Sequence, residues 1–190
     1  MDQLRVDTMT EADLLREARR GGEQAFLAIY QRHRTAVFQF AWRLTRSQST
    51  AEDVTQECFL AIMSGAAFDG ERGTLRTYLF GIVRNLVLRR LRISVREAEE
   101  PVEAAAPVDL LGDLLAIERS ELVSRAVARL PLFQREAIVL FTFEGLSLEE
   151  IAKITGVDAG AVKSRLHRAR ESLRAALAPF LVRDSERRCL

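Results

Sequence analysis

The chain has 190 residues, of which 48% are hydrophobic and 29% are charged, and its formal net charge is +1. This apolar content is enough for one or two small domains with buried cores, and it excludes a chain that is disordered throughout. No apolar stretch approaches the roughly 20 residues that cross a bilayer, and the N-terminus lacks the basic-then-apolar pattern of a signal peptide. We therefore expect a cytoplasmic protein.

The near-zero net charge hides an uneven distribution along the chain. One basic cluster lies between residues 84 and 96, a second lies between residues 163 and 174, and acidic residues gather between them at 97–109. Two separate positive surfaces are typical of a protein that binds nucleic acid.

Neither a metal site nor an enzyme active site is indicated. Cys58 and Cys189 are far apart, and the only histidines are His33 and His167, so no group has the spacing of a zinc site or a disulfide framework. No nucleophile with a base, paired carboxylates or phosphate-binding glycine loop stands out. We expect no catalysis and no cofactor.

Helical periodicity recurs in the first half of the chain. It predicts helices over residues 10–19, 23–46, 50–63 and 74–92, with Gly21 and Gly22 ending the first and Thr50 capping the third. No alternating strand pattern persists, so the fold class should be all-α. These four helices would form a first domain over residues 1–93.

A segment without periodicity follows, and a second helical domain comes after it. Residues 94–112 combine acids, alanines and prolines, which predicts an acidic, flexible linker. Residues 113–182 should form the second domain, starting with helices over 113–129 and 131–143, with Pro131 in the first turn of the latter. Residues 183–190 would be a short tail.

The strongest local pattern predicts a helix-turn-helix near the end of the second domain. Ser147 and Glu150 have the spacing of a capping box that starts a short helix. Gly156 can adopt the left-handed conformation that ends this helix, and Asp158 can cap the next one. A short turn between two helices is the arrangement of many DNA-binding proteins.

The second helix of this motif has an apolar stripe and a basic face. Val162, Leu166, Ala169 and Leu173 form the stripe that packs on the domain. The remaining surface suits phosphates and base edges in the major groove. The alternative is a solvated charged helix without a ligand. The candidate DNA contacts are Lys163, Ser164, Arg165, His167 and Arg168.

The helix over residues 50–63 has an unusual outer face. Its core face should carry Ala51, Val54, Cys58, Ala61 and Ile62. The opposite face presents Glu52, Asp53 and Gln56 together with the apolar Leu60 and Met63, with Glu57 at its margin. A mixed acidic and apolar face indicates a protein partner with a basic surface, although scattered exposed apolar residues are also common.

Three stretches in order, at residues 51–62, 73–92 and 146–170, together resemble the extracytoplasmic-function sigma factors, group IV of the sigma-70 superfamily. The resemblance covers residues 23–177. It implies a protein that binds core RNA polymerase and directs initiation at specific promoters, and that an anti-sigma factor holds inactive until a signal releases it.

The resemblance also implies roles for individual residues. Contacts with the clamp helices of core RNA polymerase would fall to Asp53, Gln56, Glu57 and Leu60. The minus-ten element would be opened by Phe68, Arg84 and Asn85, although core packing is an equal expectation for Phe68, Tyr78 and Phe80. The helix-turn-helix would bind the minus-thirty-five promoter element through the residues of its second helix given above.

A second function remains open on sequence alone. A helix-turn-helix repressor or activator could bind palindromic DNA as a dimer, with the N-terminal helices used for dimerisation or ligand binding instead of docking on polymerase.

Overall fold

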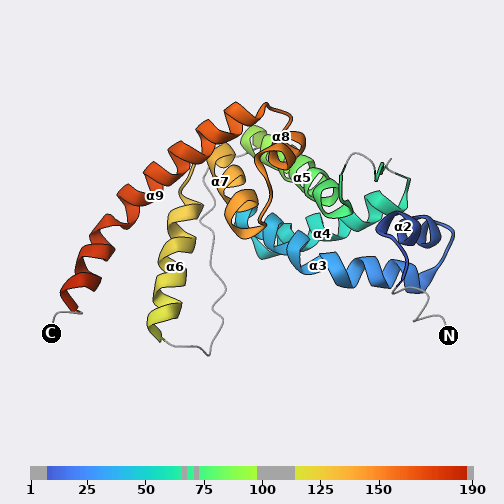
Figure 1. The fold of residues 1–190 in the computed structure, drawn as a ribbon, viewed down its shortest axis with the longest axis horizontal. Helices are drawn as coiled ribbons and strands as arrows, with labels where there is room; N and C mark the ends of the chain where they lie inside the picture. The colour runs from blue at the N-terminus through green and yellow to red at the C-terminus, as the bar shows by residue number, and fades with distance from the viewer. Residues whose placement is uncertain (1–7, 66–67, 71–72, 98–113, 188–190) are drawn as a thin grey trace. The chain divides into compact units, whose positions relative to one another are not determined.

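The computed structural model describes residues 8–65, 68–70, 73–97 and 114–187. The regular structure of these residues is entirely helical, so the predicted all-α fold class is confirmed. The contacts divide the chain into two compact units, the first containing α2 to α5 and the second containing α6, α7, η1, the start of α8 and α9 (Figure 1). None of the described helices is long and apolar enough to cross a membrane.

The described residues of the first unit form a bundle of four helices: α2 (Glu11–Arg19), α3 (Glu23–Thr45), α4 (Gln48–Met63) and α5 (Leu75–Glu97). The long α3 packs against each of the other three, and α4 also packs against α5. The core between them is apolar and closed to solvent. Its largest fully buried side chains include Leu14, Ile29, Phe40, Ile62 and Phe80.

Polar side chains cap α2 and α4 of the first unit, whereas α3 follows Gly22 and has no side-chain cap. Thr10 accepts a hydrogen bond from the amide of Asp13 at the start of α2. At the start of α4 the cap is Ser47, whose hydroxyl accepts from the amide of Thr50, so the prediction that Thr50 is the cap was wrong. Ser47 has the extended backbone of an N-cap and precedes the Thr50 amide by three residues, which is the spacing that a side-chain cap requires.

The helix α5 is longer than predicted. It begins next to Thr74, whose hydroxyl accepts from the amide of Thr77, and it continues to Glu97 instead of ending at residue 92. Its last four residues therefore belong to the segment predicted to be a linker from residue 94. The rest of that predicted linker lies outside the described residues.

The second unit contains α6 (Leu114–Ala128), α7 (Leu132–Ile138), α9 (Ala159–Arg187) and residues 148–152 of α8 (Leu148–Thr155). Within it α9 packs against α6 and α7. Pro131 was predicted in the first turn of this helix, and it is instead the N-cap of α7, one residue before the helix begins. The helix α9 continues through Pro179 to Arg187, so residues 183–187, predicted to be a tail, are helical.

A π-helical turn, η1 (Val139–Phe143), continues directly from α7. The sequence predicted a single helix over residues 131–143, and periodicity does not distinguish a π turn from an α-helix. The turn buries Val139 and Leu140 while leaving Phe143 exposed, and Gly145 follows in the left-handed conformation with φ 68°. This glycine ends the element before the helix-turn-helix begins.

Candidate functional site

The outer face of α4 carries the side chains that the sequence assigned to a protein partner. Asp53 and Gln56 are exposed, and Leu60 is the most exposed large hydrophobic residue described, at 68%. On the opposite face Ala51, Val54, Cys58 and Ile62 are fully buried. The predicted division of α4 into a core face and an exposed mixed face is therefore present, although Ala61 is only half-buried and the buried Phe59 was missed.

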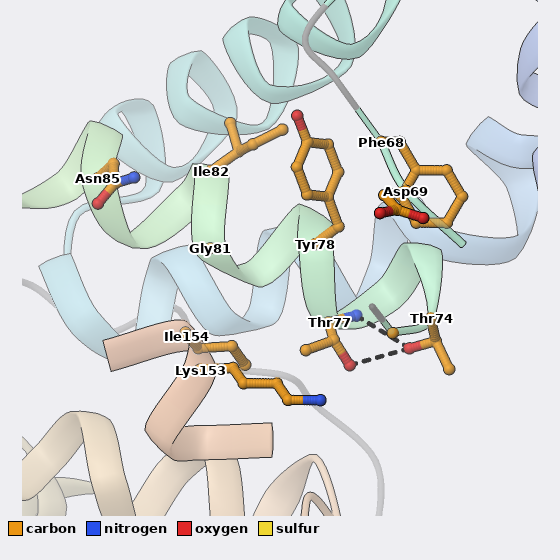
Figure 2. Close-up of a pocket in the computed structure, with 11 residues that line it drawn as sticks. Phe68, Asp69, Thr74, Thr77, Tyr78, Gly81, Ile82, Asn85, Lys153 and Ile154 are labelled. Atoms are coloured by element: carbon orange, nitrogen blue, oxygen red, sulfur yellow. Dashed lines mark hydrogen bonds between the residues drawn. The ribbon is translucent and has the colours of Figure 1, made fainter. Parts of the chain in front are cut away.

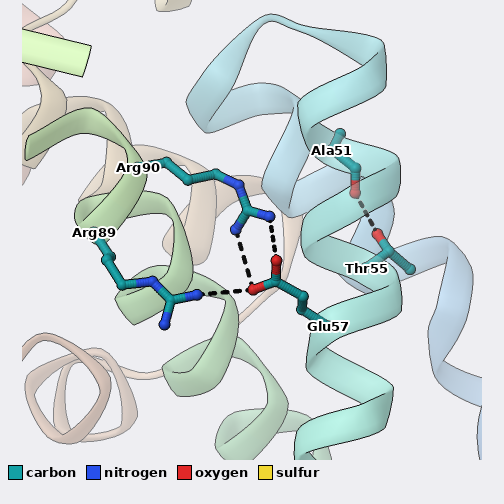
Figure 3. Close-up of polar contacts among 5 residues, drawn as sticks. All are labelled: Ala51, Thr55, Glu57, Arg89 and Arg90. Atoms are coloured by element: carbon teal, nitrogen blue, oxygen red, sulfur yellow. Dashed lines mark hydrogen bonds and ion pairs between the residues drawn. The ribbon is translucent and has the colours of Figure 1, made fainter. Parts of the chain in front are cut away.

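Glu57 differs from its neighbours on this helix because its carboxylate is bound by side chains of another helix, α5 (Figure 3). Its Oε1 accepts a hydrogen bond from Arg90 Nη2 at 2.5 Å, and its Oε2 accepts from Arg89 Nη2 at 2.9 Å. Both arginines are on α5, more than thirty residues away. From the sequence, Glu57 was predicted to lie at the partner face. Its contacts with Arg89 and Arg90 were missed, because no local sequence pattern indicates a contact between two helices.

A second face is formed by α5 and the loop before it (Figure 2). Phe68 from the loop and Tyr78 from α5 are both half-buried, with ring centroids 5.6 Å apart. Asn85 is exposed on the same side of α5 and Arg84 beside it is half-buried. This arrangement leaves aromatic surface accessible next to polar and basic groups.

The three aromatic residues of this region have different environments. Phe80 is fully buried, and its ring makes an edge contact with Phe40 at 5.0 Å between centroids. It is a core residue, which was one of the two expectations for it. Phe68 and Tyr78 are not in the core, so they remain available for contact with a ligand.

The helix-turn-helix has the predicted caps. The amide of Ser147 donates to Glu150 Oε2 at 2.9 Å, and the amide of Glu150 donates to Ser147 Oγ at 3.2 Å, which is a complete capping box. Gly156 has φ 68° at the turn. Asp158 Oδ1 then accepts from the amide of Ala161 at 2.9 Å and caps α9. These contacts fix where each helix of the motif begins.

The first turns of α9 separate a buried stripe from an exposed face. Val162, Leu166 and Ala169 are buried, whereas Leu173 is only half-buried. Four of the five predicted DNA contacts are exposed: Lys163, Ser164, His167 and Arg168. Among these, Ser164 donates its hydroxyl to the carbonyl of Gly160, and His167 Nε2 lies 3.5 Å from Glu171 Oε1. Among the five predicted DNA contacts, Lys163 and Arg168 are the exposed lysine and arginine.

Arg165 lies apart from the other four. Its side chain is 22% exposed, its guanidinium lies over the ring of Phe133 at 5.1 Å, and its Nη1 is 3.9 Å from Glu136 Oε2. Phe133 and Glu136 belong to α7, so this arginine extends into the unit and toward its core. Arg165 was predicted to contact DNA because the sequence shows its positive charge but does not show its contacts with Glu136 and Phe133.

Comparison with known proteins identifies the family. Residues 29–97 match the model of Sigma-70 region 2, and residues 120–173 match the model of Sigma-70, region 4. The ECF RNA polymerase sigma factor SigM of Mycobacterium tuberculosis is 33% identical over 165 residues, covering 86% of this chain and 83% of the relative. The chain belongs to the extracytoplasmic-function RNA polymerase sigma factors.

Other members and solved structures agree with this assignment. The ECF sigma factor SigW of Bacillus subtilis is 29% identical over 177 residues, covering 86% of this sigma factor and 94% of the relative. The sigma factor RpoE of Bartonella quintana, solved with the anti-sigma factor NepR, has a TM-score of 0.68 at 29% identity and covers 80% of this chain and 96% of that one. CnrH, solved with the cytosolic domain of CnrY, has a TM-score of 0.64 at 29% identity, covering 87% and 96%.

The family membership decides between the two functions that the sequence left open. This protein is an alternative sigma factor, a transcription factor that gives RNA polymerase its promoter specificity. The helix-turn-helix repressor or activator is not favoured. This chain matches both regions of a sigma factor, and its similarity to SigM extends well beyond the DNA-binding region.

Proposed function

We propose that this sigma factor docks on the clamp helices of core RNA polymerase through the exposed face of α4. Asp53 and Gln56 supply hydrogen-bond acceptors and one negative charge, and the exposed Leu60 supplies apolar area beside them. A small apolar centre with a polar rim is the usual composition of a protein interface. Glu57 has a lesser part in this contact, because both of its oxygens are already bound by Arg89 and Arg90.

The second part of the proposal concerns the minus-ten element. Phe68 offers an accessible ring beside Tyr78, and Arg84 and Asn85 lie further along the same helix. Aromatic rings hold unpaired bases by stacking, and basic and amide groups bind the backbone and base edges of a separated strand. This face is therefore suited to the single strand that appears when the promoter opens.

The third part concerns the minus-thirty-five element. The exposed face of α9 would enter the major groove, with Arg168 contacting a base and Lys163 contacting a phosphate. Ser164 and His167 lie on the same face and would contribute further polar contacts with the DNA. The capping box of α8 and the Asp158 cap of α9 hold the motif in the conformation that this docking requires.

These roles place the protein in the cytoplasm, where the polymerase acts, and they require binding but no catalytic step. The observation that carries the proposal is that the matches to region 2 and region 4 coincide with the helices that carry these exposed polar and basic faces. Runoff transcription tests it. Purified core polymerase with this chain should transcribe a subset of a promoter library, and core polymerase alone should not.

An anti-sigma factor is the proposed negative regulator. One structural neighbour, the sigma factor RpoE, was solved with the anti-sigma factor NepR bound, and a second, CnrH, was solved with the cytosolic domain of CnrY, which supports a protein partner of the NepR kind here. Such a protein would cover the α4 face or the α9 face and so block polymerase or DNA. The test is purification of the tagged chain from unstressed and stressed cells. An anti-sigma factor should copurify with the chain in stoichiometric amount from unstressed cells. When this partner is added back to the purified chain, it should prevent the chain from binding core polymerase.

A further inference from the structure

The contact between Glu136 and Arg165 joins two helices of the second unit that have different tasks. Glu136 is on α7, which carries none of the proposed DNA contacts, and Arg165 is on α9, which carries all of those proposed for the minus-thirty-five element. The Glu136 side chain is 3% exposed and the Arg165 side chain is 22% exposed. The contact is therefore shielded from solvent for most of its surface.

A carboxylate buried to this extent is costly unless positive charge or hydrogen-bond donors are near it. Arg165 brings a guanidinium to 3.9 Å from Oε2, which is an ion-pair distance although longer than a hydrogen bond. Phe133 lies one helical turn before Glu136 on α7 and supports the guanidinium at 5.1 Å from its ring centroid. Arg165 is thus held by charge and by stacking at once.

The position of this contact on α9 matters for DNA binding. Arg165 lies between Lys163 and Arg168 in the sequence and borders the stripe of Val162 and Leu166 that packs on the unit. Apolar stripes tolerate small rotations of a helix about its axis. Arg165, in contrast, can stay within ion-pair distance of Glu136 and over the ring of Phe133 only over a limited range of rotation of α9. Successive residues are about 100° apart around the axis of a helix, so Arg165 and Arg168 point in different fixed directions. A rotation of α9 that moves Arg165 would therefore also move Arg168 away from the base that it is proposed to contact.

We propose that Glu136 and Arg165 are positioning residues for recognition of the minus-thirty-five element. In this arrangement Arg165 does not contact DNA. It fixes the rotation of α9 against α7, so that Lys163 and Arg168 face the groove together. The inference rests on the proposed DNA-binding role of α9.

The test uses the full chain bound to core polymerase, with a promoter that this holoenzyme selects from a random library and the same promoter with a scrambled minus-thirty-five element. Affinity is measured for both at several salt concentrations. The variants are Glu136→Gln, Arg165→Met, Arg165→Lys and the double variant Glu136→Gln with Arg165→Met. Circular dichroism establishes that each is folded at the temperature used.

We expect Glu136→Gln and Arg165→Met each to lower the preference for the matched promoter by roughly threefold or more, as for a pair of coupled residues. The double variant should lose less than the product of the two single losses. The slope of log affinity against log salt should stay at the wild-type value, because no phosphate contact is removed. Arg165→Lys should keep part of the preference, since it keeps the charge but not the planar stacking group.

Two outcomes would overturn the inference. If Arg165→Met lowers the salt slope by about 0.9 while Glu136→Gln leaves the preference unchanged, Arg165 is a direct phosphate contact. If both variants lower only the melting temperature, the pair serves stability alone. Failure of the wild-type holoenzyme to distinguish the two promoters would instead refute the proposed role of α9, so the two failures are distinguishable.

Discussion

Glu57 and Arg90 form a two-contact pair between α4 and α5. Glu57 Oε1 accepts from Arg90 Nη2 at 2.5 Å and Oε2 accepts from Nη1 at 3.4 Å, while Arg89 adds a contact at 2.9 Å. The paired geometry of a guanidinium with a carboxylate is directional and holds both groups in place. It distinguishes Glu57 from Asp53 and Gln56, whose side chains are exposed, although all three lie close together in the sequence.

The first prediction is that Glu57→Ala lowers stability. The substitution leaves Arg90, whose side chain is 25% exposed, without this carboxylate. Because Glu57 is itself 40% exposed, we expect a modest loss of about 1 kcal/mol in the free energy of unfolding. Urea denaturation measures it, with Asp53→Ala as the control from the same helix. Equal stability of the two variants would mean that the cluster contributes nothing to the first unit.

The second prediction concerns polymerase binding. Replacing Asp53 and Gln56 together by Ala should weaken affinity for core polymerase at least about fivefold, the effect of roughly 1 kcal/mol, without lowering helicity. Both side chains are exposed, so the core is untouched. Glu23 and Gln24 on α3 form a chemically matched exposed pair, and their double Ala variant is the control. A titration in which both double variants bind like the wild type would remove this face from the interface.

The fold could be predicted well where the determinants are local. The capping box at Ser147 and Glu150 and the cap at Asp158 lie within a few residues of the amides that they bind, so spacing alone indicates them. The core face of α4 likewise follows from periodicity. The choice of Thr50 over Ser47 as the cap of α4 failed because both residue types are good caps and only the backbone conformation decides between them.

The parts that could not be predicted depend on contacts between distant segments. Glu57 binds Arg89 and Arg90 from another helix, and Arg165 lies against Phe133 and Glu136 from another helix. In the sequence each of these charged residues is indistinguishable from an exposed one. The site assignments were therefore least informative where a charge has a partner inside the protein.

The third prediction tests the capping box of the helix-turn-helix. Ser147→Ala removes the acceptor of the Glu150 amide and should destabilise the second unit by about 1 kcal/mol. The exposed Ser172 in the interior of α9 provides a control, because Ser172→Ala removes a hydroxyl without removing a cap. Denaturant unfolding followed by circular dichroism compares the two. The capping role is refuted if Ser172→Ala is the more destabilising change.

The fourth prediction concerns the buried thiol of Cys58. Its Sγ lies 3.7 Å from the carbonyl oxygen of Leu79, and burial raises the pKa of Cys58 to about 12 from 9.0. The native thiol therefore stays protonated at pH 8 and should not react with a disulfide reagent until the chain unfolds. A Cys189→Ala background leaves Cys58 as the single thiol for this measurement.

The same pKa shift has a consequence for stability at high pH. Between about pH 9 and 12 the unfolded chain loses the Cys58 proton while the native chain keeps it, so stability falls as pH rises through this range. Urea unfolding at pH 7 to 10 should show a steeper decline for Cys189→Ala than for Cys58→Ala with Cys189→Ala. Parallel curves would contradict the raised pKa.

The last prediction distinguishes base contacts from phosphate contacts on α9. Arg168 and Lys163 are both exposed, and Arg168 lies opposite the buried stripe whereas Lys163 lies beside it. Arg168→Ala should cost roughly 1–3 kcal/mol on the selected promoter and much less on one with a scrambled minus-thirty-five element, because a bidentate base contact depends on sequence. Lys163→Ala should weaken binding to both promoters about equally and reduce the slope of log affinity against log salt by about 0.9.

Holoenzyme binding at several salt concentrations measures both the affinity and the salt slope. Arg174→Ala, further along the same helix, is the control for general loss of charge. An equal loss for Arg168→Ala on both promoters would make Arg168 a phosphate contact, and no change from either substitution would mean that α9 does not enter the groove.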